Sequence, residues 1–319
     1  MRSSLAITVL LVAGLLAGCS SSSSSSSSSS ASGATFPAQH AEAGEPGLAQ
    51  QVHELDDGEE IALPMYQQGY TASDNPGAEL VEPGENDGFT LRVGEDADSG
   101  RAFVSIETDD TTFTWGEADD DTLTIADGDF FLSAVRALDN DVDRTANLDS
   151  QYYDYVHFGT WQIEDYDHVN NVMDVRGAAF YQGLETHPDN MPTTGSATFN
   201  GRMIGQVIPA GTAEVHPLTG DVELTADFAG GGIDGTITVE QATFNESLSL
   251  DGAIHSGSNR FDGAVTAGPA GDSAAMSFSE GAEGDFDGRF FGPAAEEVGG
   301  AWSIEQDGRV GVGAFGGRE

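Results

Sequence analysis

The chain has 319 residues, and 54 Asp and Glu residues stand against only 11 basic ones, all of them Arg, so the formal net charge is −43. A surface of this sign repels nucleic acid and anionic lipid surfaces, and the absence of Lys excludes Schiff-base chemistry. Because the acids are scattered along the whole chain, we interpret them as an acidic, halophilic adaptation; a surface that attracts a basic partner is the alternative. The single cysteine excludes an intramolecular disulfide.

The N-terminus has the pattern of an export signal. Arg2 precedes the apolar run Leu5–Leu16, which is too short to span a membrane and gives way to small residues. Leu16-Ala-Gly-Cys19 resembles the lipobox of bacterial lipoproteins, although a plain secretory signal that ends near a cysteine is the alternative. The resemblance implies that the signal peptide 1–18 is removed and that Cys19 is acylated, with palmitate as a typical chain. Since Ser20 rather than Asp follows Cys19, it also implies an anchor in the outer membrane.

The next segment is predicted to be a tether. Ser20–Ser30 is an unbroken serine tract with no apolar surface to bury, which indicates a flexible linker. Residues 36–88 are rich in Glu, Asp, Gly and Pro and contain several turn signals, so we expect irregular structure with one short strand near Ile61–Met65. Residues 19–88 are therefore assigned to an acylated, disordered, acidic tether.

A β-rich region is predicted from Phe89 to residue 194, because short β-branched and aromatic runs alternate there with Gly and Asp clusters. Phe130–Leu138 fits a strand and a short helix equally well. The aromatic alternation of Tyr152–Ile163 predicts a long strand, with Val172–Tyr181 as its partner. The remaining predicted strands of this region are Phe89–Val93, Ala102–Ile106, Thr111–Trp115 and Thr122–Ile125.

From Gly195 to residue 319 the pattern becomes regular and predicts an antiparallel sheet with one dry and one wet face. Val222, Leu224, Ala226 and Phe228 share one face, for example, while Asp and Glu occupy the other. Strands at this spacing close most simply into a soluble up-and-down barrel whose polar, acidic outside differs from the apolar band of a transmembrane barrel. A helical turn is predicted at Pro293–Glu297. The predicted strands are Ser196–Val207, Asp221–Phe228, Gly235–Val239, Ser247–Ile254, Arg260–Thr266, Ala274–Phe278, Glu283–Phe291, Val298–Ile304 and Arg309–Phe315.

Two C-terminal segments have a distinctive pattern, Gly288-Arg-Phe-Phe-Gly-Pro-Ala-Ala-Glu-Glu-Val-Gly-Gly300 and the terminal Gly313-Ala-Phe-Gly-Gly-Arg318. Together with Tyr155–Trp161 and Pro192–Gly201, they resemble the transferrin-binding protein B-like surface lipoproteins. The resemblance implies an all-β fold, with a small handle region at 89–194 followed by an eight-stranded antiparallel barrel at 195–319. It also implies a location on the outer membrane, with exposure at the cell surface and at the periplasmic face as the two alternatives.

The family resemblance further implies a binding role rather than an enzymatic one. The expected function is capture of an iron- or haem-bearing solute or protein for uptake, with a cognate outer-membrane transporter as partner. A structural or adhesive surface lipoprotein without small-molecule cargo is the alternative. The resemblance carries over no binding residue and no resident cofactor, and haem or iron as cargo is a hypothesis.

Few residues suggest a site. His157, Tyr155 and Trp161 lie in the aromatic strand and are the candidates for contact with a ligand, although a place in the dry core explains them as well. Asp139–Asp143 has the odd-position acids of an EF-hand loop, but Arg144 and Ser150 replace the required Gly and Glu, so no metal site is predicted. The seven histidines form no spaced ligand set, and no catalytic nucleophile motif is present.

Overall fold

The computed structural model describes residues 39–54, 59–74, 77–81, 88–93, 103–107, 112–115, 122–126, 131–138 and 142–319. Within these ranges the chain is all-β, as predicted, and its helices are α1, Leu48–His53, and the short 3-10 helix η1, Pro188–Asn190. None of the helices in this described part has the length and hydropathy needed to cross a membrane. The signal peptide, Cys19, the serine tract and the first three residues of the EF-hand-like loop lie outside the described residues.

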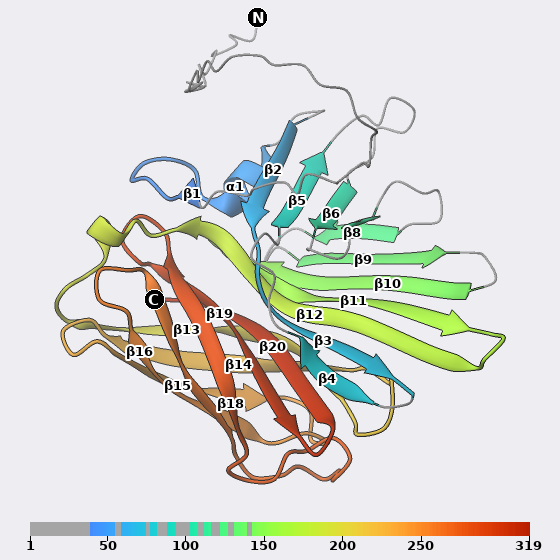
Figure 1. Cartoon of the computed structure of the whole chain (residues 1–319). Helices are drawn as coiled ribbons and strands as arrows, with labels where there is room; N and C mark the ends of the chain where they lie inside the picture. Colours follow the sequence, from blue (N-terminus) through green and yellow to red (C-terminus); the bar gives the residue numbers. More distant parts are fainter. Residues whose placement is uncertain are drawn as a thin grey trace, which may run out of the picture. The chain divides into compact units, whose positions relative to one another are not determined.

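The C-terminal strands form the predicted eight-stranded antiparallel barrel (Figure 1). It is closed, because the first strand pairs with the last and β17 pairs with β18. The strands are β13 Ser196–Ile208, β14 His216–Asp227, β15 Gly232–Val239, β16 Ser247–Ile254, β17 Arg260–Ala267, β18 Glu283–Phe291, β19 Glu297–Gln306 and β20 Arg309–Arg318.

Period-two alternation fills the barrel as the sequence predicted. Leu224, Leu250 and Val265 point into one core with Trp302, and all four are buried. Trp302 fits because its cross-strand partner is Gly313, where a Cβ atom would lie 2.5 Å from the indole Nε1. In contrast, the cross-strand row of Glu223, Thr236 and Ser249 is exposed on the outer face.

Two details of the predicted barrel are wrong. Ala274–Phe278 is not a strand, because residues 268–282 form a connection in which Phe278 packs edge-on against Phe244. The Asn245 side chain accepts from the Phe278 backbone N–H at 2.7 Å and donates to its carbonyl at 3.0 Å, so it takes the place of a neighbouring strand. Pro293–Glu297 is a turn rather than a helix, and Glu297 already begins β19.

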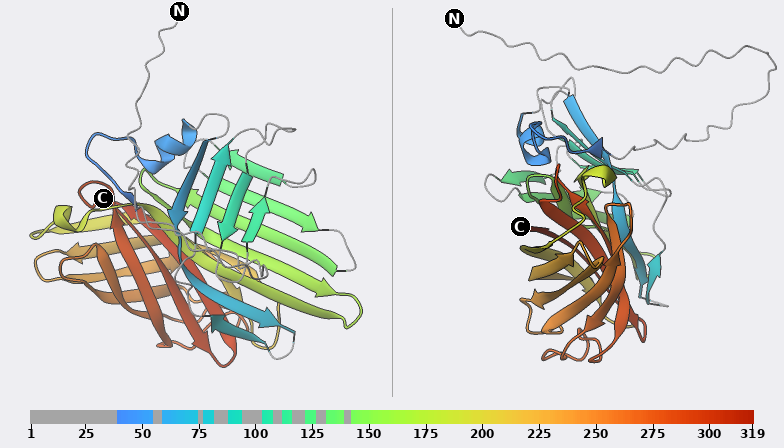
Figure 2. Two further views of the ribbon diagram at one scale, coloured as in Figure 1. Left: turned by 45° about the horizontal axis from the view of Figure 1, so that its top comes forward. Right: turned by 90° about the vertical axis from the view of Figure 1, so that its left-hand side faces the viewer.

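The preceding region contains two further sheets, which Figure 2 shows in other views. The handle sheet has the order β8-β9-β10-β11-β12-β3-β4, and the small sheet has the order β2-β5-β6-β7. Their strands are β2 Glu59–Pro64, β3 Tyr66–Ser73, β4 Ala78–Val81, β5 Gly88–Val93, β6 Phe103–Glu107, β7 Thr112–Trp115, β8 Thr122–Ala126, β9 Phe131–Leu138, β10 Val142–Tyr152, β11 Val156–Asp167 and β12 Val172–Glu185.

Two predictions from the sequence concern strands of the handle sheet. The segment around Phe130–Leu138 is a strand, β9, and not a helix. The predicted long strand Tyr152–Ile163 is divided: Tyr152 ends β10 and β11 starts only at Val156, because the intervening residues turn the chain back on itself. Its predicted pairing with the segment that begins at Val172 is confirmed.

Residues 39–81 are far more structured than the sequence predicted. β3 inserts between β12 and β4, and the two-residue strand β1, Gln39–His40, runs parallel to the end of β12. Leu48 and Val52 of α1 are buried in the same apolar cluster as Trp161. β3 was not predicted because its Gln-rich sequence does not show the hydropathy pattern of a strand. The boundaries assigned to tether, handle and barrel stay predictions, although these strands put structure inside the tether range.

Both faces of the handle sheet are buried around β11. Val156 and Phe158 pack in one apolar cluster with Ile204 and Val312 on the outer face of the barrel. On the opposite face, Trp161 belongs to a second cluster with α1 and the small sheet. The barrel exterior is therefore apolar where it meets the handle sheet, and the prediction of a polar exterior is wrong for that stripe.

We predict that removing residues before Phe89 destabilises the whole protein. A chain that starts at Phe89 lacks β3, whose Tyr70 and Ala72 are 1% and 4% exposed, and it leaves the hydrogen-bonding edge of β12 unpaired. Burial of a single large side chain contributes roughly 1.5–3 kcal/mol, so the free energy of unfolding should fall by at least about 3 kcal/mol. Urea unfolding followed by tryptophan fluorescence measures this, with a chain that starts at Gly33 as the control. Equal midpoints for the two chains would contradict the assignment of β3.

Candidate binding site

The barrel has a loop-lined pocket at the end where β12 enters it. Three connections contribute: 186–195 between β12 and β13, 228–231 between β14 and β15, and 255–259 between β16 and β17. They enclose about 630 Å³. We call this the rim pocket, and its volume is in the range of sites that hold small molecules or the side chains of a partner.

The rim pocket combines an apolar floor with polar walls. Met191, Phe228 and Ile254 line the pocket and are only partly buried. On their other side they pack against the barrel core. His255 and Asp189 are its titratable lining residues, accompanied by serine hydroxyls and glycine backbone, and no Arg lines it. This chemistry suits a neutral or cationic group with apolar surface better than an anion.

Local sequence explains the shape of these loops. The Asp227 carboxylate accepts from the N–H groups of Ala229 and Gly230, at 3.1 and 2.9 Å, which closes a tight turn after β14. Gly231 and Gly257 have φ angles of +75° and +72°, a left-handed conformation that residues with a side chain rarely adopt. Both hairpins are thereby fixed at the pocket edge.

Histidines that are scattered in the sequence come together near this rim. The rings of His40 and His187 meet edge-on with centroids 4.9 Å apart, although 147 positions separate them in the chain. His255 contacts the carboxylate of Asp262 on β17. Sequence spacing gave no signal for the His40–His187 pair, because β1 joins the end of β12 only in the folded chain. Among the residues described, no group of three His, Cys, Asp or Glu side chains could hold a metal ion.

The structure does not bring the three predicted ligand contacts together at an opening. His157 is fully buried, stacks on Tyr152 with centroids 3.7 Å apart, and its Nδ1 is 2.8 Å from the Gln182 amide nitrogen. Trp161 is 6% exposed and donates its indole N–H to Gln67. Tyr155 is half-buried in the turn before β11. A ligand-binding role for these residues stays a prediction, and core packing accounts for His157 and Trp161.

Glu297 holds the turn that contains Tyr155. Its carboxylate is 2% exposed and accepts the backbone N–H groups of Asp154, Tyr155 and Val156 at 2.9, 2.8 and 3.0 Å. Burial raises the pKa of Glu297 to about 7, while the three N–H donors act in the opposite direction. The sequence motif Gly288–Gly300 therefore contains a residue that connects the barrel to the handle sheet.

A second polar connection lies along β12 and β18. Glu185 is 3% exposed, accepts from Tyr66 at 2.6 Å and from Asn259 at 2.8 Å, and is 3.6 Å from Arg289. The Arg289 guanidinium also lies over the Tyr66 ring, 3.8 Å from its centroid. These contacts join β3 and β12 of the handle sheet to β18 of the barrel, and they give the Gln- and Tyr-rich β3 its polar partners.

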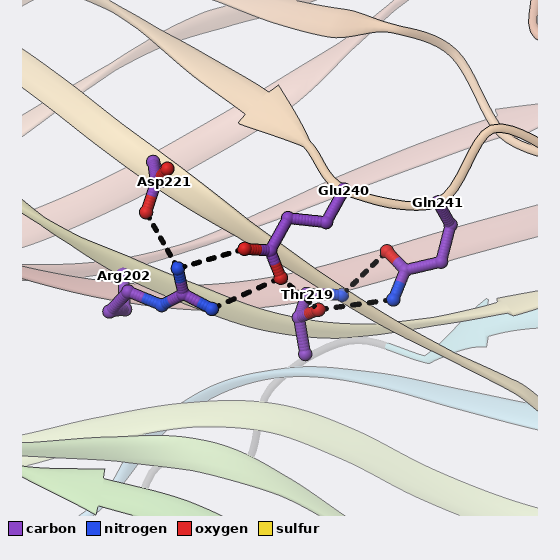
Figure 3. Close-up of polar contacts among 5 residues, drawn as sticks. All are labelled: Arg202, Thr219, Asp221, Glu240 and Gln241. Carbon is purple, nitrogen blue, oxygen red and sulfur yellow. Dashed lines mark hydrogen bonds and ion pairs between the residues drawn. The ribbon is translucent and has the colours of Figure 1, made fainter.

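An exposed ion network crosses the outer barrel face (Figure 3). Arg202 on β13 donates to Asp221 at 2.7 Å and to both oxygens of Glu240 at 3.0 and 3.1 Å. Thr219 also donates to Glu240 and exchanges hydrogen bonds with Gln241. Arg202 holds the pKa of Glu240 below its usual value through these hydrogen bonds. Since the carboxylates of Asp221 and Glu240 are exposed to solvent, we interpret the network as a stabilising surface contact and not as a binding site.

Comparison with known protein families finds a match for the barrel. Residues 191–319 match the family model described as the C-lobe and N-lobe β-barrels of transferrin-binding protein B. These residues are therefore similar to the barrels of that family, as the sequence motifs indicated. The match starts at the 3-10 helix region and includes every barrel strand and all the rim-pocket residues after Asp189. No curated protein sequence matches the chain.

Solved structures with similar arrangements share little sequence. Intact Ap-TbpB, with N and C lobes, is 15% identical, with 79% of this chain and 59% of that chain covered and a TM-score of 0.40. Isotype 1 transferrin-binding protein B from Neisseria meningitidis is 17% identical, covered over 79% and 43%, with a TM-score of 0.43. HpuA from Kingella denitrificans, solved with human haemoglobin, is 16% identical, covered over 89% and 94%, with a TM-score of 0.40. The chain thus spans about three fifths or less of the two transferrin-binding chains.

Glu297 gives a prediction about pH. Because its folded-state pKa is raised above the unfolded value of 4.5, the folded protein holds this proton at pH values where the unfolded chain has lost it. This contribution to stability is therefore complete below about pH 4.5 and is lost as the pH rises through about 7. Glu297→Gln removes the titration, so the stability difference between wild type and variant should shift by up to about 3 kcal/mol between pH 4.5 and 7.5. Urea unfolding at both pH values measures it, and parallel pH profiles would refute the assignment.

His157 gives a prediction of opposite sign. Burial lowers its pKa well below 6.5, so the folded state keeps the ring neutral while the unfolded chain binds a proton. This contribution is present above pH 6.5 and is lost as the pH falls below it. His157→Phe should therefore flatten the acid side of the stability profile, although it costs the Gln182 contact at every pH. Chemical unfolding between pH 5 and 7.5, with His216→Phe as the half-exposed control, tests this. A variant that keeps the full acid-side loss would contradict it.

Proposed function

We propose that this protein is an outer-membrane-anchored binding lipoprotein that captures an iron- or haem-bearing solute or protein for uptake. The observation that carries the proposal is the match of residues 191–319 to the barrels of transferrin-binding protein B. The lipobox-like residues before Cys19 support the anchor, and Ser20 after Cys19 favours the outer membrane. Exposure at the cell surface is part of the same proposal. A cognate outer-membrane transporter is the partner that such uptake requires. The proposal contains no catalytic step.

The rim pocket is the proposed contact surface for the cargo. Its apolar floor of Met191, Phe228 and Ile254 supplies the buried centre that a protein interface needs, and the serine hydroxyls around it supply a polar edge. A carrier protein could insert an apolar side chain there. Haem would have to leave its carboxylates in solvent, because no Arg lines the pocket.

A structural or adhesive role without cargo is the second candidate. The regular outer face of the barrel favours it, since rows such as Glu223, Thr236 and Ser249 offer repeated hydroxyls and carboxylates without large apolar side chains. Such a face suits contact with hydrated surfaces. The two candidates differ in whether the protein shows saturable binding of a soluble cargo.

Binding to the purified mature chain at high salt tests the proposal. We expect saturable binding in a haem titration followed by absorbance, or in a pull-down of transferrin and haemoglobin. Ser256→Trp fills the rim pocket without changing its floor and should weaken binding at least about tenfold, whereas Ser249→Trp on the outer barrel face should not. Absence of binding in all arms would exclude these cargoes and favour the adhesive role. Binding that Ser256→Trp leaves unchanged would move the contact surface away from the rim.

A further inference from the structure

A second pocket lies in the handle sheet. It encloses about 430 Å³ and shares no lining residue with the rim pocket. The hairpin of β3 and β4 and the neighbouring strands β11 and β12 form it. We call it the handle pocket. Nothing in the proposed capture of cargo makes use of it.

Strand register places complementary charges on one face of this pocket. Arg176 pairs across the sheet with Thr71, and Thr71 pairs with Glu79. One step along the same face, Asp174 pairs with Asp165 on one side and with Ser73 on the other. Side chains opposite one another in neighbouring strands point the same way, so all six project from one face of the sheet. All six line the pocket.

Arg176 is the unusual member of this group. Its Nε atom is buried without a hydrogen-bond partner, and among the described residues its guanidinium makes no hydrogen bond or ion pair. Arg202 and Arg289, in contrast, are paired with carboxylates, and Arg309 donates to two backbone carbonyls. In a chain with 54 acids, a partly buried arginine without a carboxylate is unexpected, because an unpaired buried donor costs free energy.

The charge of the lining restricts the ligand. A guanidinium presents a planar fork that matches a carboxylate with two parallel hydrogen bonds. A simple anion would nevertheless be repelled, because Asp165, Asp174 and Glu79 line the same pocket. A molecule that carries both charges avoids this repulsion, because its carboxylate binds Arg176 while its ammonium group faces the acids. Gly77, which has no side chain, also lines the pocket and leaves room for the side chain of the ligand.

We propose that the handle pocket binds a free α-amino acid as its zwitterion, with Arg176 as the carboxylate-binding residue and Asp174 and Glu79 as the ammonium-binding residues. The hydroxyls of Thr71 and Ser73 complete the polar lining. Ligand binding at this site is independent of the rim pocket and of the function proposed for it.

Saturation-transfer NMR with the mature chain in detergent tests this proposal against each of the twenty L-amino acids. We expect at least one to bind saturably. Its N-acetyl derivative, which lacks the ammonium group, and its amide, which lacks the carboxylate, should each bind at least about tenfold more weakly. Failure of all twenty to bind, or equal binding of both derivatives, would overturn the proposal.

Substitutions then locate the site. Arg176→Gln should weaken binding at least about tenfold and Asp174→Asn about threefold or more. Arg260→Gln, at an exposed arginine on the barrel, is the matched control and should bind normally. Urea unfolding shows whether each variant is folded, and if Arg176→Gln is not, the exposed Asp174→Asn decides. Binding that persists unchanged in the folded variants would refute the assignment.

Discussion

The burial of the handle sheet on both of its faces is the constraint on which the rest of the structure depends. Around β11, Phe158 on one face and Trp161 on the other each need an apolar partner layer. The outer wall of the barrel covers the first face, and α1 with the small sheet covers the second. Polar groups trapped at these contacts must then be satisfied internally, which explains why Glu185 and Glu297 each accept several hydrogen bonds.

Sequence patterns predicted the strands in which buried and exposed residues alternate. They failed for strands and loops whose contacts come from distant segments of the chain. Ser247–Ile254 and Glu283–Phe291 were predicted with their observed ends, because one face of each is dry. β3 was missed because Gln67 and Gln68 resemble loop residues, and only contacts with Trp161 and Asp287 explain them in a strand. The rim pocket could not be predicted, since it is assembled from three loops. The motif at Gly288–Gly300 was visible, but the role of Glu297 depends on a turn more than a hundred residues earlier.

The few arginines are distributed in a way that composition alone does not suggest. Arg202 joins β13 to two neighbouring acids, and Arg289 neutralises a buried glutamate and covers a tyrosine ring. Each of the two arginines therefore serves a small, defined set of contacts. Because the chain has few cations and many acids, the position of each arginine is informative. Arg176, which has no partner among the described residues, is the arginine to which we assign a ligand.

Closure of the barrel also has a kinetic consequence. β13 pairs with β20, so residues such as Met203 and Phe315 must meet across a loop of about 110 residues. Contacts of such sequence separation form slowly, and until they form, β13 and β20 present open edges that another chain could extend. The carboxylates on the outer face make two such half-formed sheets repel one another. The acidic surface thus protects the protein during folding as well as keeping the finished barrel in solution.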